Sequence, residues 1–428
     1  MIHFIGIGGI GVSALAKYYL SKGAAVGGSD LKRSEMTDEL GGLGMRIKIG
    51  HREGNLLKKT GRVIYTSAIP PANPEFREAK KRKLTVESYA EVLGALTRQY
   101  RTITISGAHG KSTTTALAAF VLTEGYWDPT VIVGTKVREF GNSNFRRGYG
   151  PFLVLEADEW NRSFLHYSPE IAIVTNIDAE HLDTYKTVEG VEEAFRDYMA
   201  LVPREGKIIA NRDDERVRRI VEPFRRQVVW YSSRDRAAHA VRQVLRVPGE
   251  HNVSNALAAF TLGRTLGVRD ADILRALGRF TGTWRRFEFK GVHHGAFVFT
   301  DYAHHPTEIK KTLEAARNRF PFRRLWCVYQ PHQRERLKYL WDEFIEAFDR
   351  ADRICLLSVY DVAGREIVTA RRTVNSEKLV ERLVERGKHA VHVDSFDAAR
   401  AMIGAEVRPG DAVLVMGAGD IYKLTESI

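Results

Sequence analysis

Residues 102–116 read TITISGAHGKSTTTA, and the other predicted elements of the chain are interpreted from this segment outward. Its first five residues alternate β-branched and polar side chains, which predicts a buried strand. Gly107 and Gly110 predict a tight turn, and the Ala- and Leu-bearing run from Lys111 onward predicts a helix. In such a strand–loop–helix, backbone N–H groups at the start of the helix bind a phosphate. Lys111 can reach the terminal phosphates of a nucleotide, and the hydroxyl of Ser112 can bind Mg²⁺.

The loop is shorter than the usual G-x-x-x-x-G-K-[ST] pattern, because it reads G-x-x-G-K-S. A Gly-Lys-Ser turn without any ligand is the alternative interpretation. The strand before the loop and the helix after it are the context that the motif requires, so we favour a nucleotide-phosphate site. The predicted phosphate-binding residues are Gly107, His109, Gly110, Lys111, Ser112 and Thr113.

Acidic residues follow two further apolar runs, residues 152–156 and 171–176, which we expect to be buried strands. The carboxyl ends of parallel strands share one sheet edge with the phosphate loop, so these side chains should converge on the nucleotide. Carboxylate oxygens suit Mg²⁺, and an imidazole beside them can complete the shell of a second ion. The alternative is that they are ordinary polar residues at strand ends. The residues concerned are Glu156, Asp158, Glu159, Asp178, Glu180 and His181.

The N-terminal block begins with an apolar strand from Ile2 that leads into residues 6–11, GIGGIG, and then into a helical pattern to Leu20. These glycines permit a tight turn and a close approach to a diphosphate. Asp30, about 20 positions later, can accept a hydrogen bond from a ribose hydroxyl. The pattern does not separate a nicotinamide dinucleotide from a UDP-sugar. Because the chain reaches the phosphate loop before a second mononucleotide-binding half, we favour a mononucleotide-linked ligand.

In the C-terminal part, four apolar runs alternate with helical patterns, which predicts a third, mostly parallel sheet. Two polar clusters, residues 301–306 (DYAHHP) and 330–336 (QPHQRER), follow such runs and indicate a ligand-binding edge. We therefore predict an α/β protein of three domains. They are a Rossmann-like domain over residues 1–97, a central P-loop ATPase domain with a mostly parallel sheet over 98–282, and a Rossmann-like C-terminal domain over 283–428.

The composition is that of an ordinary globular protein of 428 residues, 44% hydrophobic and 28% charged. The net charge is +12, but Lys and Arg are dispersed and not interleaved with aromatic residues, so we expect no nucleic-acid partner. Cys327 and Cys355 lie within apolar runs, which favours a reducing compartment over a disulfide framework. Since there is no basic leader and no apolar run of about 18 residues, we expect a cytoplasmic protein without membrane insertion.

The order of the motifs resembles that of the Mur ligase family. The sequences GIGGIG, SGAHGKSTTT, EADE, NIDAEHLDTY, HNVSNA, RRFE, DYAHHPTE, QPH and GAGDI follow one another from end to end of the chain. The resemblance implies an N-terminal domain for a UDP-sugar, a central ATPase and a C-terminal ligase domain that brings the amino acid and part of the ATP site. His109, together with DYAHHP and QPH, is typical of the branch that acts on UDP-N-acetylmuramate.

The resemblance also implies roles for single residues. The catalytic residues would be Lys111, Glu156, His181 and His304. One Mg²⁺ would be bound by Ser112 and Glu156, and a second by His181. Beyond the phosphate loop, ATP would be contacted by His251, Asn252, Asn255, Arg286 and Asp301. The UDP-sugar would be bound by Gly8, Gly9, Ile10, Gly11, Asp30 and Ser67. L-alanine would be surrounded by Tyr302, His304 and Arg336.

The activity that the resemblance implies is ATP-dependent joining of L-alanine to the lactyl carboxylate of UDP-N-acetylmuramate, through an acyl phosphate, in peptidoglycan precursor synthesis. The alternatives are a recycling ligase that attaches a murein tripeptide, a nicotinamide (NAD) oxidoreductase and a non-catalytic UDP-sugar sensor. Residues 182–185 (LDTY) and 359–366 (VYDVAGRE) favour L-alanine over the tripeptide. An oxidoreductase leaves the phosphate loop and the acidic clusters unexplained. We expect a monomer or a homodimer.

The chain departs from the family pattern at a few positions. Threonine is usual where Ala108 and Ser112 stand, and Ser112 keeps the hydroxyl that can bind a metal ion. Trp160 and Asn161 replace a usual pair of a small residue and aspartate. Gln333 occupies the place of a usual arginine, and this change bears on the preference for the amino acid.

Overall fold

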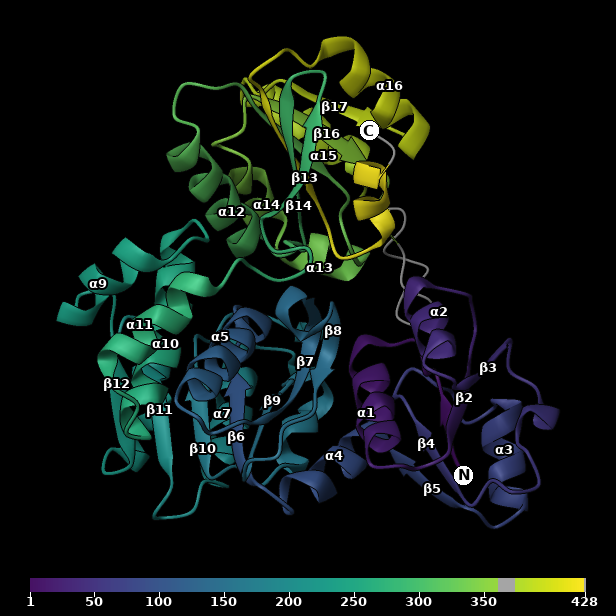
Figure 1. Ribbon diagram of the computed structural model, residues 1–428. Coiled ribbons are helices and arrows are strands. Elements are labelled where there is room, and N and C mark those ends of the chain that lie inside the picture. Colours follow the sequence, from purple (N-terminus) through teal and green to yellow (C-terminus); the bar gives the residue numbers. More distant parts are fainter. Residues whose placement is uncertain (361–373, 427–428) are drawn as a thin grey trace. The chain divides into compact units, whose positions relative to one another are not determined.

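The computed structural model describes residues 1–360 and 374–426, so residues 361–366 of the VYDVAGRE motif lie outside the described part (Figure 1). The chain forms two compact units, Met1–Val244 with Ser254–Phe280, and Leu245–Val253 with Thr281–Ile428. The predicted α/β class with parallel sheets is confirmed. The domain boundaries after residues 97 and 282 stay predictions. Among the described helices, none is both long and apolar enough to cross a membrane.

The first sheet is parallel throughout and has the strand order β3-β2-β1-β4-β5. Its strands are β1 (Ile2–Ile5), β2 (Val26–Asp30), β3 (Arg46–Ile49), β4 (Arg62–Tyr65) and β5 (Thr85–Ser88). The helices of this part are α1 (Ile10–Ser21), α2 (Glu35–Gly42), α3 (Pro74–Lys81) and α4 (Tyr89–Thr97). A full dinucleotide fold has six strands, so this five-stranded sheet agrees with the inference of an incomplete second half.

The second sheet has seven strands in the order β12-β11-β10-β6-β9-β7-β8. They are β6 (Arg101–Ser106), β7 (Thr130–Val137), β8 (Ser143–Arg146), β9 (Phe152–Glu156), β10 (Ile171–Val174), β11 (Lys207–Asn211) and β12 (Val228–Tyr231). The predicted strands before the phosphate loop and before both acidic clusters are confirmed, and they are neighbours in the sheet. The strand β8 is not among the strands predicted from the sequence. The polar strand β8 shows no apolar alternation, and its pairing with β7 holds it at the edge.

The helix that follows the phosphate loop, α5 (Lys111–Glu124), packs between the second sheet and α11 (Asp270–Arg279). The rings of Phe120 and Phe280 meet edge to face at 5.6 Å. Glu124 accepts hydrogen bonds from Arg275 at 2.7 Å and from Arg279 at 3.1 Å. The other helices of this unit are α6 (Leu182–Tyr185), α7 (Val188–Met199), α8 (Glu215–Val221), α9 (Arg236–Val244) and part of α10 (Glu250–Thr265).

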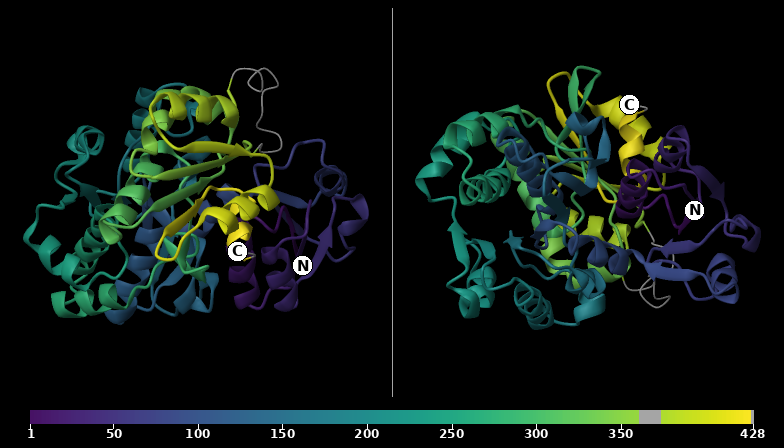
Figure 2. Two further views of the ribbon diagram at one scale, coloured as in Figure 1. Left: turned by 90° about the horizontal axis from the view of Figure 1, so that it is seen from above. Right: turned by 60° about the horizontal axis from the view of Figure 1, so that its bottom comes forward.

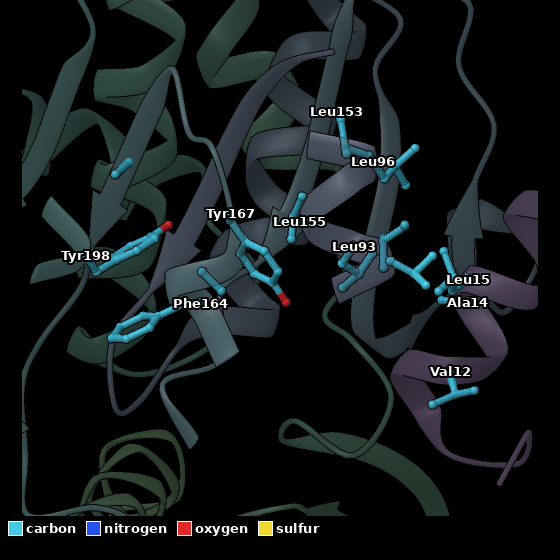
Figure 3. Packing of buried hydrophobic residues seen from close by; sticks show 14 of the residues in the cluster. Val12, Ala14, Leu15, Leu93, Leu96, Leu153, Leu155, Phe164, Tyr167 and Tyr198 are labelled. Carbon is cyan, nitrogen blue, oxygen red and sulfur yellow. The ribbon is translucent and has the colours of Figure 1, made fainter. Parts of the chain in front are cut away.

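One hydrophobic core joins the first and second sheets within the first unit. Figure 3 shows Leu15 of α1 and Leu93 and Leu96 of α4 in the same cluster as Leu153 and Leu155 of β9. The rings of Phe164 and Tyr198 stack at 4.4 Å at the other end of this cluster. Because these side chains are buried together, the glycine loop after β1 and the phosphate loop after β6 belong to one packed body.

The third sheet, in the second unit, has the order β13-β14-β18-β15-β16-β17, and its strands run side by side in all views (Figures 1 and 2). The strands are β13 (Glu288–His293), β14 (Ala296–Asp301), β15 (Leu325–Tyr329), β16 (Arg353–Leu357), β17 (Ala390–Val393) and β18 (Ala412–Met416). The described helices are α12 (Pro306–Arg319), α13 (Arg334–Tyr339), α14 (Trp341–Ala347), α15 (Ser376–Glu385) and α16 (Phe396–Glu406). Only β13 is antiparallel, so the predicted, mostly parallel sheet is confirmed.

Candidate active site

The phosphate loop is a turn that only glycine can make at two positions. Gly107 has a φ of +133°, and a Cβ there would overlap Thr175 Oγ1 and lie 3.0 Å from the carbonyl oxygen of Asn176. Gly110 has a φ of +83°, and a Cβ there would overlap the side-chain amide of Asn255. Helix α5 begins directly after this turn, at Lys111. The loop therefore presents the first N–H groups of a helix at the carboxyl edge of the sheet, as phosphate binding requires.

The loop is held from the neighbouring strand β10. Asn176 accepts a hydrogen bond from the backbone N–H of His109 at 2.9 Å and donates to the His109 carbonyl at 2.9 Å. Thr175 donates to the same carbonyl at 2.8 Å. The imidazole Nε2 of His109 lies 2.9 Å from a carboxylate oxygen of Asp178. The loop is thus fixed in shape by contacts that do not depend on a ligand.

Lys111 lies among carboxylates at the centre of this edge. Its Nζ donates to the Gly107 carbonyl at 2.7 Å and to the two carboxylate oxygens of Glu159 at 2.9 and 3.1 Å. Burial alone would lower the pKa of Lys111, but the attraction of Glu159, Asp158 and Glu156 outweighs burial and raises the pKa above its usual value. Lys111 is therefore charged at all physiological pH values, and an arriving phosphate competes with Glu159 for the ammonium group.

The acidic residues converge as the sequence predicted, but in a particular grouping. Asp158, Glu159 and His181 place one potential ligand atom each within 4.8 Å of one another. Nε2 of His181 lies 3.8 Å from Glu159, whose side chain is 1% exposed. Glu156 lies outside this group, and its Oε1 accepts a hydrogen bond of 2.5 Å from the backbone N–H of Gly134 in β7. Such oxygen-rich donors suit Mg²⁺, and the assignment of Ser112, Glu156 and His181 as its ligands stays a prediction.

The glycine loop after β1 lies at the carboxyl edge of the first sheet. The carboxylate of Asp30, at the end of β2, accepts a hydrogen bond of 2.8 Å from the backbone N–H of Gly8. Helix α1 begins at Ile10, and Gly9 caps it with an extended backbone. Ser67, which follows β4, is exposed. The structure therefore brings Gly8, Gly9 and Asp30 together, with Asp30 also supporting the loop itself.

The three ATP-binding residues predicted near the start of α10, which are His251, Asn252 and Asn255, do not all lie in the same unit. His251 and Asn252 belong to the second unit, where the side-chain amide of Asn252 donates to the carbonyl of Pro248 at 2.7 Å. Asn255 belongs to the first unit and lies against Gly110 of the phosphate loop. Only Asn255 of these three is placed beside the phosphate loop within one described unit.

In the second unit, the candidate nucleotide residues lie where β14 ends. The carboxylate of Asp301 accepts hydrogen bonds of 2.7 Å from the backbone N–H groups of Phe287 and Ala303. Burial raises the pKa of Asp301 above its usual value. Arg286 lies 3.4 Å from Glu308 and 5.2 Å from the ring centre of Tyr302. Asp301 thus fixes the turn that carries Arg286.

The candidate amino-acid residues come together around two imidazoles. The ring of His304 lies edge to face with Tyr302 at 5.3 Å and with His332 at 5.8 Å. Nδ1 of His304 lies 3.2 Å from a carboxylate oxygen of Glu308. Nη1 of Arg336 lies 3.4 Å from Nδ1 of His332. The structure therefore places Tyr302, His304 and Arg336 in one cluster, and its role in binding L-alanine stays a prediction.

Two contributors, Asn176 and Glu308, had no assigned role in the sequence interpretation, and Glu159 was expected near the nucleotide and the metal but not as the partner of Lys111. Asn176 holds the phosphate loop, Glu159 holds Lys111, and Glu308 holds His304. Glu159 and Asn176 stand inside the quoted motifs EADE and NIDAEHLDTY, so their position after buried strands was the available signal. Glu308 is the last residue of the quoted motif DYAHHPTE, and its spacing of four residues from His304 on the way into α12 could have indicated the contact.

Replacing His181 with alanine is expected to weaken the metal dependence of the reaction while leaving ATP on the phosphate loop. The imidazole is the nitrogen donor beside Asp158 and Glu159 in this group, and losing a residue of a metal site commonly lowers metal affinity about tenfold or more. The measurement is the Mg²⁺ concentration that gives half-maximal rate. His239→Ala, at an exposed histidine of α9, is the control. An unchanged Mg²⁺ dependence would mean that His181 is not a metal ligand and is only a polar residue in the loop after β10.

The glycine loop after β6, the lysine that begins α5 and the carboxylates at the same edge define a nucleotide-phosphate-binding α/β protein. The chain belongs to the Mur ligase family. Residues 1–101 match the "Mur ligase family, catalytic domain", residues 105–263 the "Mur ligase middle domain" and residues 285–419 the "Mur ligase, glutamate ligase domain".

Two relatives of similar length share the same name. The UDP-N-acetylmuramate–L-alanine ligase of Clostridium botulinum (strain Okra / Type B1) is 38% identical over 99% of this chain and 96% of its own. That of Salinibacter ruber (strain DSM 13855 / M31) is 40% identical over 100% of this chain and 94% of its own.

Solved structures agree in fold. The UDP-N-acetylmuramate-alanine ligase of Thermotoga maritima superposes with a TM-score of 0.83 at 28% identity, over 100% of this chain and 97% of that one. A murein peptide ligase from Psychrobacter arcticus has a TM-score of 0.72 at 21% identity, over 100% and 97%, which shows a shared fold alone.

Proposed function

We propose that this chain is an ATP-dependent ligase that joins L-alanine to the lactyl carboxylate of UDP-N-acetylmuramate, in peptidoglycan precursor synthesis. The observation that carries the proposal is Lys111, held at the start of α5 among Glu156, Asp158 and Glu159 in a chain of this family. This arrangement suits transfer of a phosphoryl group, because that reaction needs positioned positive charge and little covalent chemistry.

In the first step the lactyl carboxylate attacks the γ-phosphorus of ATP, the bond to the bridging oxygen breaks, and an acyl phosphate and ADP result. The N–H groups that begin α5 and the ammonium of Lys111 stabilise the negative charge on the transferred group. For this, the ammonium group of Lys111 exchanges its contact with Glu159 for contacts with the phosphate oxygens. Glu159 stays oriented because its carboxylate also lies 3.8 Å from His181.

Mg²⁺ is proposed as the metal, with two ions and with Ser112, Glu156 and His181 as the ligands from this chain. When bound, it supplies further neutralisation of the charge on the phosphates. The donor set fits, because hydroxyl and carboxylate oxygens dominate it. Asp158 and Glu159 are further candidate ligands, since both share the 4.8 Å group with His181.

In the second step the free amine of L-alanine attacks the acyl carbon, and inorganic phosphate leaves. We propose that Arg336 binds the carboxylate of L-alanine and that Tyr302 and His304 lie around it. The amine must lose a proton before or during the attack. His304 is the candidate acceptor, because its Nδ1 is held 3.2 Å from a carboxylate oxygen of Glu308 within this cluster.

The recycling of a murein tripeptide by the same chemistry is the second candidate. The relatives at 38–40% identity carry the alanine ligase name, whereas the murein peptide ligase is 21% identical. We therefore propose L-alanine as the amine. A cytoplasmic location and a monomeric or homodimeric state stay predictions.

The decisive experiment is a phosphate-release assay with ATP, Mg²⁺ and UDP-N-acetylmuramate against L-alanine, glycine, L-serine and the murein tripeptide. Release that depends on both the UDP-sugar and L-alanine is the expected result. Release with the tripeptide but not with L-alanine would replace the proposal by the recycling function. Release with neither amine would exclude both ligase activities.

Replacing Arg336 with lysine is expected to raise the KM for L-alanine severalfold or more while the KM values for ATP and the UDP-sugar stay unchanged. A guanidinium binds a carboxylate through two parallel N–H bonds, which an ammonium cannot reproduce. Arg334→Lys is the control, because the Arg334 side chain donates to the carbonyl of Val374 at 3.3 Å instead. An alanine effect from Arg334→Lys and none from Arg336→Lys would assign the carboxylate to Arg334.

A further inference from the structure

Arg285 is a buried cation that the reaction described above does not use. Its side chain is 4% exposed, and among the described residues it has no carboxylate within ion-pair distance. Its Nη2 donates to two backbone carbonyls of one loop, those of Gly417 and, at 2.9 Å, Gly419. These residues follow β18, in the GAGDI motif.

Three aromatic rings surround the guanidinium. Its central carbon lies 4.5 Å from the ring centre of Tyr422, 4.8 Å from that of Tyr302 and 5.4 Å from that of Trp284. Guanidinium groups are attracted to aromatic faces at such distances, and the attraction grows when water is excluded. The rings and carbonyls thus take the place of an acidic partner.

The backbone of Arg285 joins the same elements. Its carbonyl accepts a hydrogen bond of 2.7 Å from the N–H of Tyr302, and its N–H donates to Glu288 at 2.9 Å. Its φ of 57° is unusual for a residue with a side chain. Gly417 in turn donates to the carbonyl of Asp301 at 3.1 Å. One residue therefore ties together the turn before β13, the loop after β14 and the loop after β18.

A buried charge without an acidic partner is costly, and burial lowers the pKa of Arg285 below its usual value. A neutral residue could fill the same space without that desolvation penalty. The cost is understandable if the guanidinium fork is needed to hold two loops in one fixed arrangement. Lysine could not do this, because it lacks the planar fork that bonds to two carbonyls and lies against rings.

We propose that Arg285 is a positioning residue of the amino-acid subsite, which fixes the ring of Tyr302 against the loop of Gly417–Gly419. This inference rests on the proposed function, since Tyr302 is placed beside L-alanine there. Arg285 acts through Tyr302 and the loop and does not itself touch the substrate.

Arg324 supplies a matched control. Its guanidinium also bonds to a loop, through Asp411 at 2.6 Å and the carbonyl of Glu406, and also lies over an aromatic ring, Trp326 at 5.3 Å. It stands just before β15, at the amino edge of the third sheet, whereas the contacts of Arg285 follow β14 and β18 at the carboxyl edge. Both changes to lysine should disturb packing, but only one should disturb the subsite.

The test compares Arg285→Lys, Arg324→Lys and the wild-type full-length protein in the phosphate-release assay and by amide hydrogen exchange. Arg285→Lys should raise the KM for L-alanine roughly tenfold, which corresponds to losing one hydrogen bond to a charged group. The KM values for ATP and the UDP-sugar should change less. Amides of residues 417–420 should exchange faster in Arg285→Lys and not in Arg324→Lys.

An unchanged KM for L-alanine in Arg285→Lys, or an equal rise of all three KM values, would overturn the inference, because a merely structural role predicts either result. If Arg285→Lys does not fold, Tyr422→Leu, which removes the nearest ring, must raise the KM for L-alanine selectively. If the wild type releases no phosphate with L-alanine, the proposed function has failed, and unchanged exchange at 417–420 would separately refute the role of Arg285 in holding the loop.

Discussion

Replacing Lys111 with alanine is expected to lower kcat for ATP-dependent ligation by roughly a thousandfold or more, because removing one group that stabilises transition-state charge commonly has this effect. The Nζ of Lys111 is the cation nearest to the phosphate loop, 2.7 Å from the Gly107 carbonyl. The measurement is phosphate release at saturating ATP. Lys207→Ala, at an exposed lysine that begins β11, is the control and should keep the wild-type rate.

The same variant tests the contact with Glu159. Without Lys111, the carboxylate of Glu159 is left 1% exposed and without its cation, which typically lowers the free energy of unfolding by about 3 kcal/mol. Adding Glu159→Gln to Lys111→Ala should restore thermal stability and leave activity low. If Lys111→Ala keeps more than about a tenth of the wild-type rate, the loop does not bind the transferred phosphate in the way proposed here.

Replacing Gly107 with alanine is expected to abolish ATP binding and to lower the free energy of unfolding by about 3 kcal/mol, from overpacking and backbone strain together. The new Cβ would overlap Thr175 Oγ1, and the φ of +133° strains any residue with a side chain. Since Thr175 and Asn176 hold His109, the whole loop must shift.

Gly23→Ala is the control that separates backbone strain from overpacking as causes of the effect expected at Gly107. Gly23 has a φ of +82°, but a Cβ there would meet nothing within 4 Å. It should therefore cost only about 1 kcal/mol, from backbone strain alone, with no effect on ATP. Thermal unfolding and titration with a fluorescent ATP analogue measure the two effects. Equal ATP affinity of the two variants would show that the close contact with Thr175 does not shape the phosphate loop.

Elements with a strong local signal were predictable from the sequence. The residue types from Thr102 to Ala116 alone predict a strand, a turn and a helix, and the structure has β6 and α5 at those positions. The strand β8 was missed because its sequence, SNFR, has no apolar alternation, and only its partner β7 makes it a strand. The edge strand β13, with partly exposed residues, was missed for the same reason.

Some features of the candidate site could likewise be predicted from the sequence, and others could not. That Glu156, Glu159 and His181 share one edge followed from parallel strands, and the structure agrees. Which carboxylate holds Lys111 did not follow, because that depends on side-chain conformations that the spacing of residues in the sequence does not specify. The surroundings of Arg285 were beyond prediction too, since they bring together residues 285, 302, 417 and 422 from three separate parts of the chain.

The order in which this chain leaves a ribosome gives the packing of α5 a further significance. The buried face of α5 rests on α11, which is made about 150 residues later, and translation adds about 5–20 residues each second. For roughly ten seconds or more, the apolar surface of α5 around Phe120 therefore lacks its partner Phe280, and Glu124 lacks Arg275 and Arg279. The helix that follows the nucleotide loop is therefore synthesised long before the helix that covers it. A nascent chain that stalls before residue 280 would leave this apolar surface of α5 exposed to chaperones and to other chains.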